Sequence, residues 1–339
     1  MESPAKILLI RFSSIGDIIL TSPLVRILRR TFPLAQIDFV TKRESADLVR
    51  HNPNLSSVIE FEEGQLQALR TRIRKERYDA ILDLHGSLRS RMLRRGAGVK
   101  TIGVIDKRII KRFLLVQFKW NLYGAIVPVA ERYIETATSL GVHDDGGGCE
   151  VYVPSDVSSR VSTMLDTLGP DTARRFIGIV PMAKHKTKMW PEERFVEFGK
   201  RISGDNVAIL IFGSASEIAP CDHIAGAINA GSNTPRAYNL AGKLNLLETA
   251  AAFDRCDRIV TNDTGLMHLA AARGRKITAI FGPTVKEFGF FPYRAESVVV
   301  EHNDLSCKPC SHIGLAECPM GHFRCMNDIA VDEVAKSME

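Results

Sequence analysis

Short apolar segments alternate with helix-like segments along the chain, and this alternation restricts the possible folds more than any other feature. Helices cover both faces of a parallel sheet, so its strands appear as apolar runs separated by helical patterns. Helical patterns at 22–31 and 64–76 fall between such runs. The first half predicts strands over 6–12, 36–41, 57–61, 78–85 and 100–105.

The second half repeats the alternation after a stretch rich in glycine and acids. That stretch, "GVHDDGGGCEVYVPSD", has turn and linker composition and precedes a helix candidate at 156–168, so a domain boundary is expected near 145–172. Further strands are expected over 175–182, 206–213, 237–241, 258–262, 277–282 and 297–301. The prediction is an α/β protein of two doubly wound domains, with ligands outside the carboxyl ends of the strands and the cleft between the domains as the natural site.

Composition and charge indicate the cellular location and the kind of partner to expect. No run reaches the roughly 18 apolar residues of a membrane span, and "MESPAKILLIRF" lacks a signal-peptide pattern, so a cytoplasmic protein is expected. The segment from Gly86 to Lys119 carries a net charge of +9, against +6 for the whole chain. This asymmetry indicates either an anionic partner or a solvated basic face.

The stretch 258–284, "RIVTNDTGLMHLAAARGRKITAIFGPT", predicts strand, turn, helix, strand and turn. Asp263 or Thr264 can cap a helix that begins at Gly265, where free N–H groups would attract an anion. His268 lies one turn further on and is either a second anion contact or a core histidine. A second turn, at 282–284, follows the next strand and is expected beside the first.

These motifs resemble glycosyltransferase family 9, the heptosyltransferases of lipopolysaccharide core assembly. The resemblance includes "NDTGLMHLAAARG…AIFGPT", "FSSIGDIILTSPLVRILRRTFP", "KMWPEERF", "IFGSASE" and "CKPC…CPMGHFRCM", and runs from about residue 5 to about 333. It implies the GT-B fold, with an acceptor domain over 1–160, a nucleotide-sugar domain over 170–325 and a C-terminal helix over 326–339. It also implies inverting transfer from ADP-heptose to a lipid A–linked sugar, with no metal and no cofactor.

Asp17 matches the acid that the family uses as catalytic base. An inverting transfer needs one carboxylate to take the proton of the attacking hydroxyl. The alternative from the residues alone is that Asp17 only caps a helix.

On the donor side, Lys188 matches the family's phosphate-binding lysine. Glu217 matches the ribose contact, Asp263 the donor-sugar contact, and Leu244 the apolar residue against the base. Ser214, Thr264, Gly265 and His268 complete the expected donor site.

On the acceptor side, Arg89 and Ser90 in "DLHGSLRS" match a family motif. The segment 107–123, "KRIIKRFLLVQFKWNLY", is basic and aromatic. It is expected either to lie on an anionic membrane surface, as a peripheral contact with the inner membrane, or to form a core helix with extended basic side chains.

Four cysteines crowd the tail: Cys307, Cys310, Cys318 and Cys325. Their spacing permits a zinc site. The expectation is instead a reduced or partly disulfide-linked tail near the domain junction, with no metal.

Two other functions remain open at this level. One is a different nucleotide-sugar enzyme of the same fold, with another donor or with 2-epimerase activity. The other is a zinc-stabilised protein that binds nucleic acid or another anionic polymer, although it leaves the phosphate-type turns unexplained. A dinucleotide dehydrogenase is disfavoured because no G-x-G-x-x-G follows the first strand.

Overall fold

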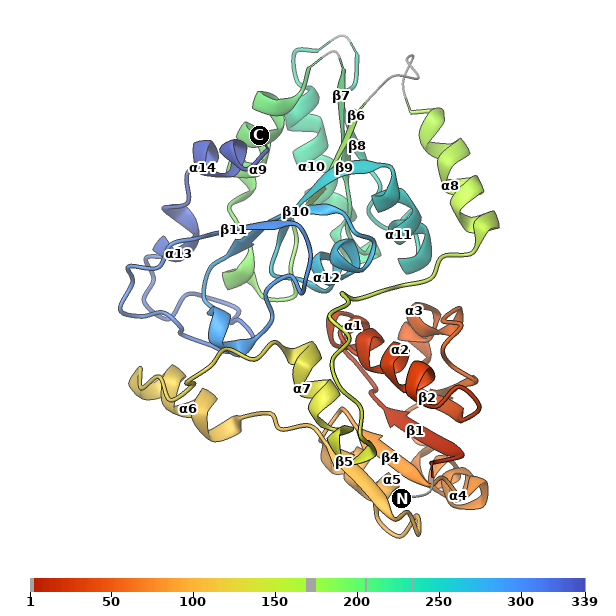
Figure 1. Ribbon diagram of the computed structural model, residues 1–339. Helices are drawn as coiled ribbons and strands as arrows, with labels where there is room; N and C mark the ends of the chain where they lie inside the picture. The colour runs from red at the N-terminus through yellow and green to blue at the C-terminus, as the bar shows by residue number, and fades with distance from the viewer. Residues whose placement is uncertain (1–2, 169–174, 205, 233, 339) are drawn as a thin grey trace. The chain divides into compact units, whose positions relative to one another are not determined.

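The computed structural model describes residues 3–168, 175–204, 206–232 and 234–338. The chain divides into two compact units, drawn in Figure 1. Unit 1 comprises Met1–Ile109 and Val127–Tyr152, and unit 2 comprises Ile110–Ile126 and Val153–Glu339. The change of unit at Tyr152 falls inside the linker expected from the sequence, whereas residue 170, the expected start of the second domain, lies outside the described residues.

Unit 1 is built on a five-stranded parallel sheet in the order β3-β2-β1-β4-β5. The strands are β1 (Lys6–Ile10), β2 (Gln36–Lys42), β3 (Ser57–Phe61), β4 (Ala80–Asp83) and β5 (Thr101–Val104). All five fall where the sequence predicts them. β1 is apolar and almost wholly buried, as expected for a strand covered on both faces.

The helices of unit 1 cover both faces of its sheet. α4 (Leu66–Glu76) and α5 (Leu88–Arg94) pack their buried leucine and isoleucine side chains against one face. α2 (Ser22–Thr31), which starts with a proline in its first turn, lies against α7 (Val129–Glu135). The short helices α1 (Ile15–Ile19) and α3 (Asp47–Arg50) contact each other.

Unit 2 is built on a six-stranded parallel sheet in the order β11-β10-β9-β6-β7-β8. The strands are β6 (Arg175–Val180), β7 (Val207–Ile211), β8 (Ala237–Asn239), β9 (Cys256–Asn262), β10 (Lys276–Phe281) and β11 (Ser297–Glu301). Both units are thus doubly wound, as the alternating pattern predicts.

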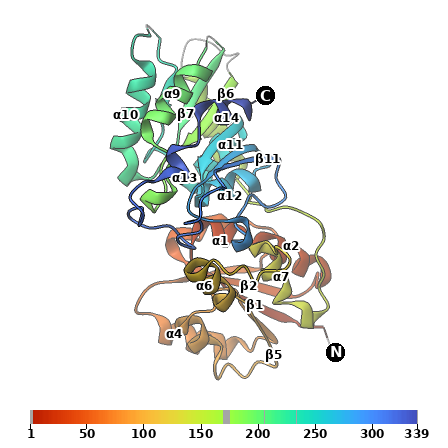
Figure 2. The same cartoon turned by 90° about the vertical axis from the view of Figure 1, so that its left-hand side faces the viewer.

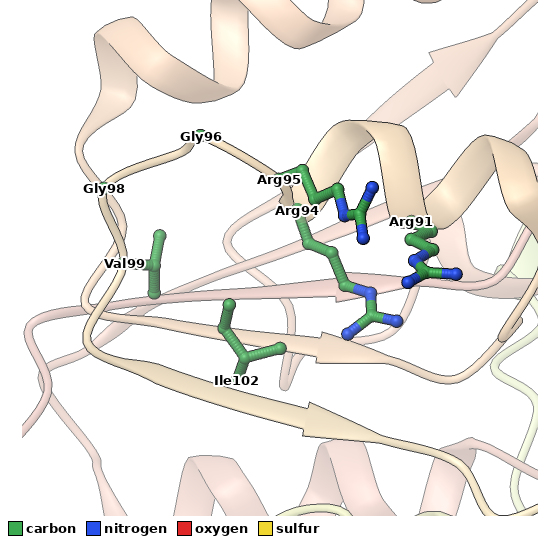
Figure 3. A pocket seen from close by; sticks show the side chains of 7 residues that line it. All are labelled: Arg91, Arg94, Arg95, Gly96, Gly98, Val99 and Ile102. Atoms are coloured by element: carbon green, nitrogen blue, oxygen red, sulfur yellow. The ribbon is translucent and has the colours of Figure 1, made fainter.

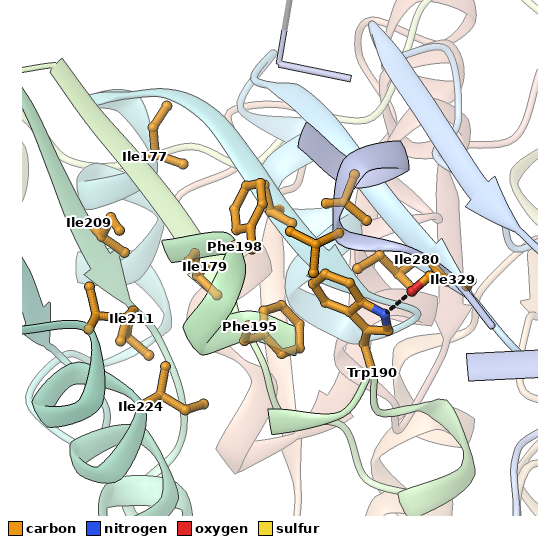
Figure 4. Packing of buried hydrophobic residues seen from close by; sticks show 14 of the residues in the cluster. Ile177, Ile179, Trp190, Phe195, Phe198, Ile209, Ile211, Ile224, Ile280 and Ile329 are labelled. Carbon is orange, nitrogen blue, oxygen red and sulfur yellow. Dashed lines mark hydrogen bonds between the residues drawn. The ribbon is translucent and has the colours of Figure 1, made fainter. Parts of the chain in front are cut away.

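One face of this second sheet carries a large apolar core, shown in Figure 4. α9 (Glu192–Ile202) and α10 (Ile218–Asn229) lie side by side over it, and α14 (Val331–Lys336) packs against α9 (Figure 2). Trp190 is fully buried there and donates its indole N–H to the Ile329 carbonyl at 3.1 Å. This hydrogen bond joins the tail to the core. Replacing such a buried aromatic by alanine typically costs about 3–5 kcal/mol of stability.

The remaining helices of unit 2 are α8 (Ser155–Asp166), α11 (Leu246–Asp254) and α12 (Gly265–Ala272). α8 packs against α11, and α11 and α12 contact β9. The tail forms two short helices, α13 (Arg324–Asn327) and α14, where the sequence suggested a single helix over 326–339. Residue 339 lies outside the described residues.

The segment 110–126 separates from the rest of the N-terminal half and belongs to unit 2. It includes most of α6 (Ile109–Phe118), of which only Leu115 is buried. Leu115 and Tyr123 form an apolar cluster with Phe288, and Lys119 donates to the carbonyls of Cys307 and Pro309 at 3.1 and 2.6 Å. The core-helix alternative for this segment is therefore wrong. None of the helices in the described ranges is long and apolar enough to cross a bilayer.

Candidate functional site

Each sheet has one place where the strand order reverses. In unit 1 it lies between β1 and β4, and in unit 2 between β6 and β9. Adjacent strands there lead to loops that diverge, and in doubly wound sheets ligands bind outside the carboxyl ends of the strands at this point. The polar residues at the two reversal points are therefore the first candidates for a functional site.

Asp17 lies at the reversal point of unit 1, in the first turn of α1 just after β1. Its Oδ2 accepts hydrogen bonds from the Ser14 hydroxyl at 2.8 Å and the Ser14 amide at 3.3 Å. Asp17 thus caps its helix, as the simpler sequence interpretation suggested. Capping is not its only interaction, however, because two further side chains converge on the same carboxylate.

These side chains are Arg11 and Tyr133. The Arg11 guanidinium lies 2.5 Å from Asp17 Oδ2, and the Tyr133 hydroxyl donates to Oδ1 at 3.1 Å. Arg11 is 8% exposed and also donates to the Leu84 carbonyl at 2.7 Å. Burial alone would raise the pKa of Asp17, but Arg11 and the Ser14 hydrogen bonds outweigh it and hold that pKa below its usual value. The carboxylate is therefore ionised at neutral pH.

His85 follows the end of β4 and joins this group. Burial, with Arg11 and Lys107 nearby, lowers its pKa to about 4, so its ring is neutral at physiological pH. The ring lies edge-on to Phe12, with 4.9 Å between the ring centroids. This histidine lies inside the motif "DLHGSLRS" but was not among the predicted site residues, and its position directly after a buried strand was the available signal.

The two expected acceptor contacts differ in availability. Arg89 is exposed and pairs with Glu63, with 3.1 Å between Nη1 and Oε1. Ser90 is fully buried, and its hydroxyl accepts from the Ser87 amide at 2.9 Å and donates to the Ser87 carbonyl at 3.0 Å. The hydroxyl of Ser90 is thus used to start α5, whereas the Arg89 side chain is exposed to solvent; both stay predicted acceptor contacts.

Lys188 and Asp263 meet at the reversal point of unit 2. Lys188 belongs to a 3₁₀ turn (Lys186–Lys188) after β6, and Asp263 follows β9. Lys188 Nζ lies 2.6 Å from Asp263 Oδ2, and the Thr284 hydroxyl donates to the same oxygen at 2.9 Å. The two turns at 263 and 282–284 therefore lie together, as predicted from their strands. A positive charge and a carboxylate are fixed side by side.

The helix beyond Asp263 supplies the expected anion-binding end. α12 begins at Gly265 with Thr264 as its N-cap, but the Thr264 side chain makes no capping bond. Its buried hydroxyl oxygen has no hydrogen-bond partner among the described residues. His268 is 4% exposed, and its ring centroid lies 6.4 Å from that of Phe290. The helix end and the Thr264 hydroxyl are thus available to an anionic ligand, whereas His268 is largely enclosed.

The proposed nucleoside contacts lie on two neighbouring loops. Glu217 Oε2 accepts from the Ser214 amide at 2.7 Å and from its hydroxyl at 2.9 Å, closing a 3₁₀ turn (Ala215–Glu217) after β7. Its second carboxylate oxygen makes no hydrogen bond within the described part of the chain. Leu244 is half-buried in the turn between β8 and α11. Both residues lie beyond the carboxyl ends of strands, on the same edge as Lys188.

The tail supports the lysine loop. Thr187 and Leu315 exchange hydrogen bonds, at 2.7 Å from the Leu315 amide to the Thr187 hydroxyl and at 3.2 Å from the Thr187 amide to the Leu315 carbonyl. Gly314 has a positive φ and lies so close to His185 that an added Cβ would come within 2.6 Å of it. Burial lowers the pKa of His312, and the charges of Arg112 and Lys188 lower it further, so α6 also contributes a cation near this loop.

The four tail cysteines are free thiols. Burial and the neighbouring thiol of Cys310 raise the pKa of Cys325 to about 12. Across the described ranges, no group of three or more His, Cys, Asp or Glu side chains is arranged to hold a metal ion.

Comparisons with known proteins give these clusters a context. The model of glycosyltransferase family 9 (heptosyltransferase) matches residues 66–321. Lipopolysaccharide heptosyltransferase 2 of Salmonella typhimurium is 28% identical over 305 residues, covering 84% of each chain. Lipopolysaccharide heptosyltransferase 1 of Pseudomonas aeruginosa is 26% identical over 321 residues, covering 90% of this chain and 86% of the relative.

Solved structures agree on the fold. The structure titled as E. coli ADP-heptose LPS heptosyltransferase II superposes with a TM-score of 0.75 at 24% identity, covering 98% of this chain and 97% of that one. A family 9 glycosyltransferase from Veillonella parvula gives a TM-score of 0.74 at 21% identity, covering 88% and 87%. The fold is that of the GT-B glycosyltransferases. The matched family model and the two doubly wound units together identify the chain as an enzyme of glycosyltransferase family 9.

Proposed function

We propose that this enzyme transfers a heptose from ADP-heptose, with inversion, to an anionic lipopolysaccharide core acceptor, a Kdo- or heptosyl-lipid A. The observation that supports it best is the pair of reversal-point clusters, an ionised carboxylate in unit 1 and a lysine beside a helix N-terminus in unit 2. These are the two groups that such a transfer needs. The relatives named as lipopolysaccharide heptosyltransferases support the choice of sugar and pathway.

Asp17 is the proposed catalytic base. The acceptor oxygen bonds to the anomeric carbon as the bond from that carbon to the diphosphate breaks, and the hydroxyl proton passes to Asp17. A carboxylate of low pKa suffices because the attacking oxygen becomes strongly acidic as its new bond forms. Arg11 and Tyr133 act as positioning residues, since they fix both carboxylate oxygens. Arg89 is the proposed contact for the acceptor's acidic groups.

The departing ADP needs positive charge on its diphosphate. Lys188, the N-terminal amides of α12 at Thr264 and Gly265, and Ser214 are placed on one edge of the sheet to supply hydrogen bonds to it. When the diphosphate attracts Lys188, Asp263 is released to accept hydrogen bonds from sugar hydroxyls.

The remaining contacts concern the nucleoside. Glu217 bonds the ribose hydroxyls, and Leu244 packs against the base. His268, behind the helix end, supports the phosphate-binding turn. No cofactor is part of the proposal.

The donor half of the proposal is tested by calorimetry with ADP-heptose, ADP and UDP-sugars on the wild type and on Lys188→Ala. Lys186→Ala is the matched control, because Lys186 is exposed in the same turn and carries the same charge. We expect the ADP ligands to bind the wild type and the control and to be lost from Lys188→Ala. Absence of binding for every nucleotide-sugar, or equal loss in both variants, would contradict the donor site.

For the acceptor half, we propose that the enzyme acts at the cytoplasmic face of the inner membrane. Six side chains of the segment 109–122 are more than half exposed although large and apolar: Ile109, Ile110, Phe113, Phe118, Trp120 and Leu122. The Phe118 ring lies edge-on to Phe113 and tilted against Trp120, with centroid distances of 6.0 and 5.4 Å, and Lys111 on the same helix is exposed. Aromatic and cationic groups on one short segment suit an anionic lipid surface.

Vesicle flotation tests this contact. Trp120→Ser is expected to weaken binding to vesicles containing phosphatidylglycerol, whereas Leu34→Ser, which removes a 99% exposed leucine elsewhere, leaves binding unchanged. If both variants bind like the wild type, the segment does not contact lipid.

A further inference from the structure

Unit 1 contains a hollow of about 390 Å³ at the end of α5 that the proposed transfer does not use. Three arginines line it, Arg91 and Arg94 from α5 and Arg95 directly after it (Figure 3). Val99 and Ile102 add an apolar wall. The hollow therefore combines cationic and apolar surface.

The local sequence explains why the hollow is open. α5 has seven residues and stops at Arg94, and Gly96 and Gly98 turn the chain with positive φ before β5 begins. Ile102 of the edge strand β5 faces this gap and stays 42% exposed. The opposite face of β5 is closed, because Gly103 lies directly on the Thr136 carbonyl.

The charges around the hollow are strongly unbalanced. Arg94 pairs with the buried Asp83, with 3.1 Å from Nε to Oδ2. Arg91 and Arg95 are exposed, and within the described ranges neither side chain forms an ion pair. Arginines gathered this closely repel one another, and an oxyanion would relieve the repulsion.

Two more arginines, from α4, fix the rim. Arg74 donates to the Gly96 carbonyl at 2.9 Å, and Arg70 donates to the Arg95 carbonyl at 3.4 Å. They hold the turn in place without neutralising the cationic side chains that line the hollow. Three guanidinium groups thus line the hollow and two more bind the carbonyls of its turn, while the nearby carboxylate, Asp83, is already paired with Arg94.

The hollow touches the reversal-point side only through Arg94, which reaches Asp83 at the carboxyl end of β4, whereas its turn lies elsewhere. Asp17 follows the carboxyl end of β1, whereas Arg95 to Val99 lead into the amino end of β5. In a parallel sheet these are opposite edges. The Arg95–Val99 side of the hollow and the proposed catalytic base therefore serve different parts of a ligand or different ligands.

We propose that this hollow binds a phosphate group carried on a larger molecule whose apolar part covers Val99 and Ile102. Guanidinium groups bind phosphate through paired hydrogen bonds, and three of them can surround one phosphate. The phosphate can belong to a lipid headgroup or to a free phosphorylated molecule. The site does not depend on the identity of the sugar donor or acceptor.

Hydrogen exchange of the peptide 88–102 gives a local readout that the donor site in unit 2 does not affect. The probes are inorganic pyrophosphate and phosphatidylcholine vesicles with and without phosphatidic acid. The test variant is Arg91→Ala/Arg95→Ala. The matched control is Arg72→Ala/Lys75→Ala, which removes two exposed charges from α4, outside the hollow. Ile102→Trp keeps every charge and fills the hollow.

We expect a probe to slow hydrogen exchange in this peptide in the wild type and in the control variant. The affinity for the probe should be at least about tenfold weaker in the arginine double variant, and it should also be weaker in Ile102→Trp. Protection by pyrophosphate identifies a free phosphate ligand, and protection only by phosphatidic acid vesicles identifies a headgroup; either result supports the site. Equal loss in the test and control variants would show general charge attraction and overturn it. No protection by either probe would also overturn it.

Discussion

The two reversal-point clusters occupy equivalent places in two similar sheets, yet their charges are arranged in opposite order. In unit 1 the cation Arg11 is the more enclosed partner, with 10% of its side chain exposed against 17% for Asp17. In unit 2 the carboxylate Asp263 is the more enclosed, with 7% exposed against 14% for Lys188. In the proposed mechanism, each inner group fixes the outer one. One scaffold would thus supply a base in one unit and a phosphate-binding cation in the other.

The largest effect is expected from Asp17→Asn. The amide keeps the shape of the side chain but cannot take a proton, so the transfer rate should fall by about 10²–10⁴-fold. Steady-state kinetics measures the fall, and Lys186→Ala is the control for an unrelated charge change. A rate within a few-fold of wild type would show that Asp17 only caps its helix.

The second largest effect is expected from Asp263→Asn, which removes the negative charge of the more enclosed partner in unit 2. Lys188 then loses its 2.6 Å partner, and the donor sugar loses a hydrogen-bond acceptor. We expect kcat/KM for the donor to fall by about 10–100-fold, on the scale of a lost charged hydrogen bond, while ADP binds as well as before or better. Weaker ADP binding in this variant would contradict the assignment of Asp263 to the sugar.

Arg11→Met tests the role of the inner cation of unit 1 through the pH dependence of kcat/KM. Without the cation, burial raises the pKa of Asp17. Because Asp17 must be ionised to act, the acidic fall in kcat/KM should move to higher pH in this variant. Arg11→Lys keeps the cation and should return the pH profile most of the way to that of the wild type. An unchanged pH profile would separate Arg11 from catalysis.

The smallest effect is expected from Thr284→Val. It removes one hydrogen bond to Asp263, at 2.9 Å, without removing charge. Donor affinity should fall only a few-fold, in keeping with about 1 kcal/mol for a neutral donor, with thermal stability changed little. A loss as large as that of Lys188→Ala would mean that Thr284 contacts the donor directly.

The sequence predicted the parts of both clusters that depend on local pattern. Asp17, Lys188 and Asp263 each follow a recognisable apolar strand, and the turn at 282–284 follows the strand beside that of Asp263. The strands themselves were predicted for the same reason, since a buried parallel strand has a distinctive apolar run.

The sequence did not predict contacts made across long separations. Tyr133 reaches Asp17 from 116 residues away, and nothing in its own helix marks it for that role. The packing of Tyr123 on Phe288 likewise depends on tertiary structure, so the attachment of residues 110–126 to unit 2 had no local signal. Ser90 resembled a ligand contact because its motif does, although its hydroxyl is used within α5.

The central claim is that unit 1 supplies the base and unit 2 holds the donor. The most direct test is calorimetry of ADP-heptose with Asp17→Asn and Lys188→Ala side by side, with transfer measured on the same preparations. The account predicts that Asp17→Asn binds the donor like the wild type but does not transfer it, whereas Lys188→Ala loses donor binding. Loss of donor binding in Asp17→Asn, or wild-type binding in Lys188→Ala, would contradict it.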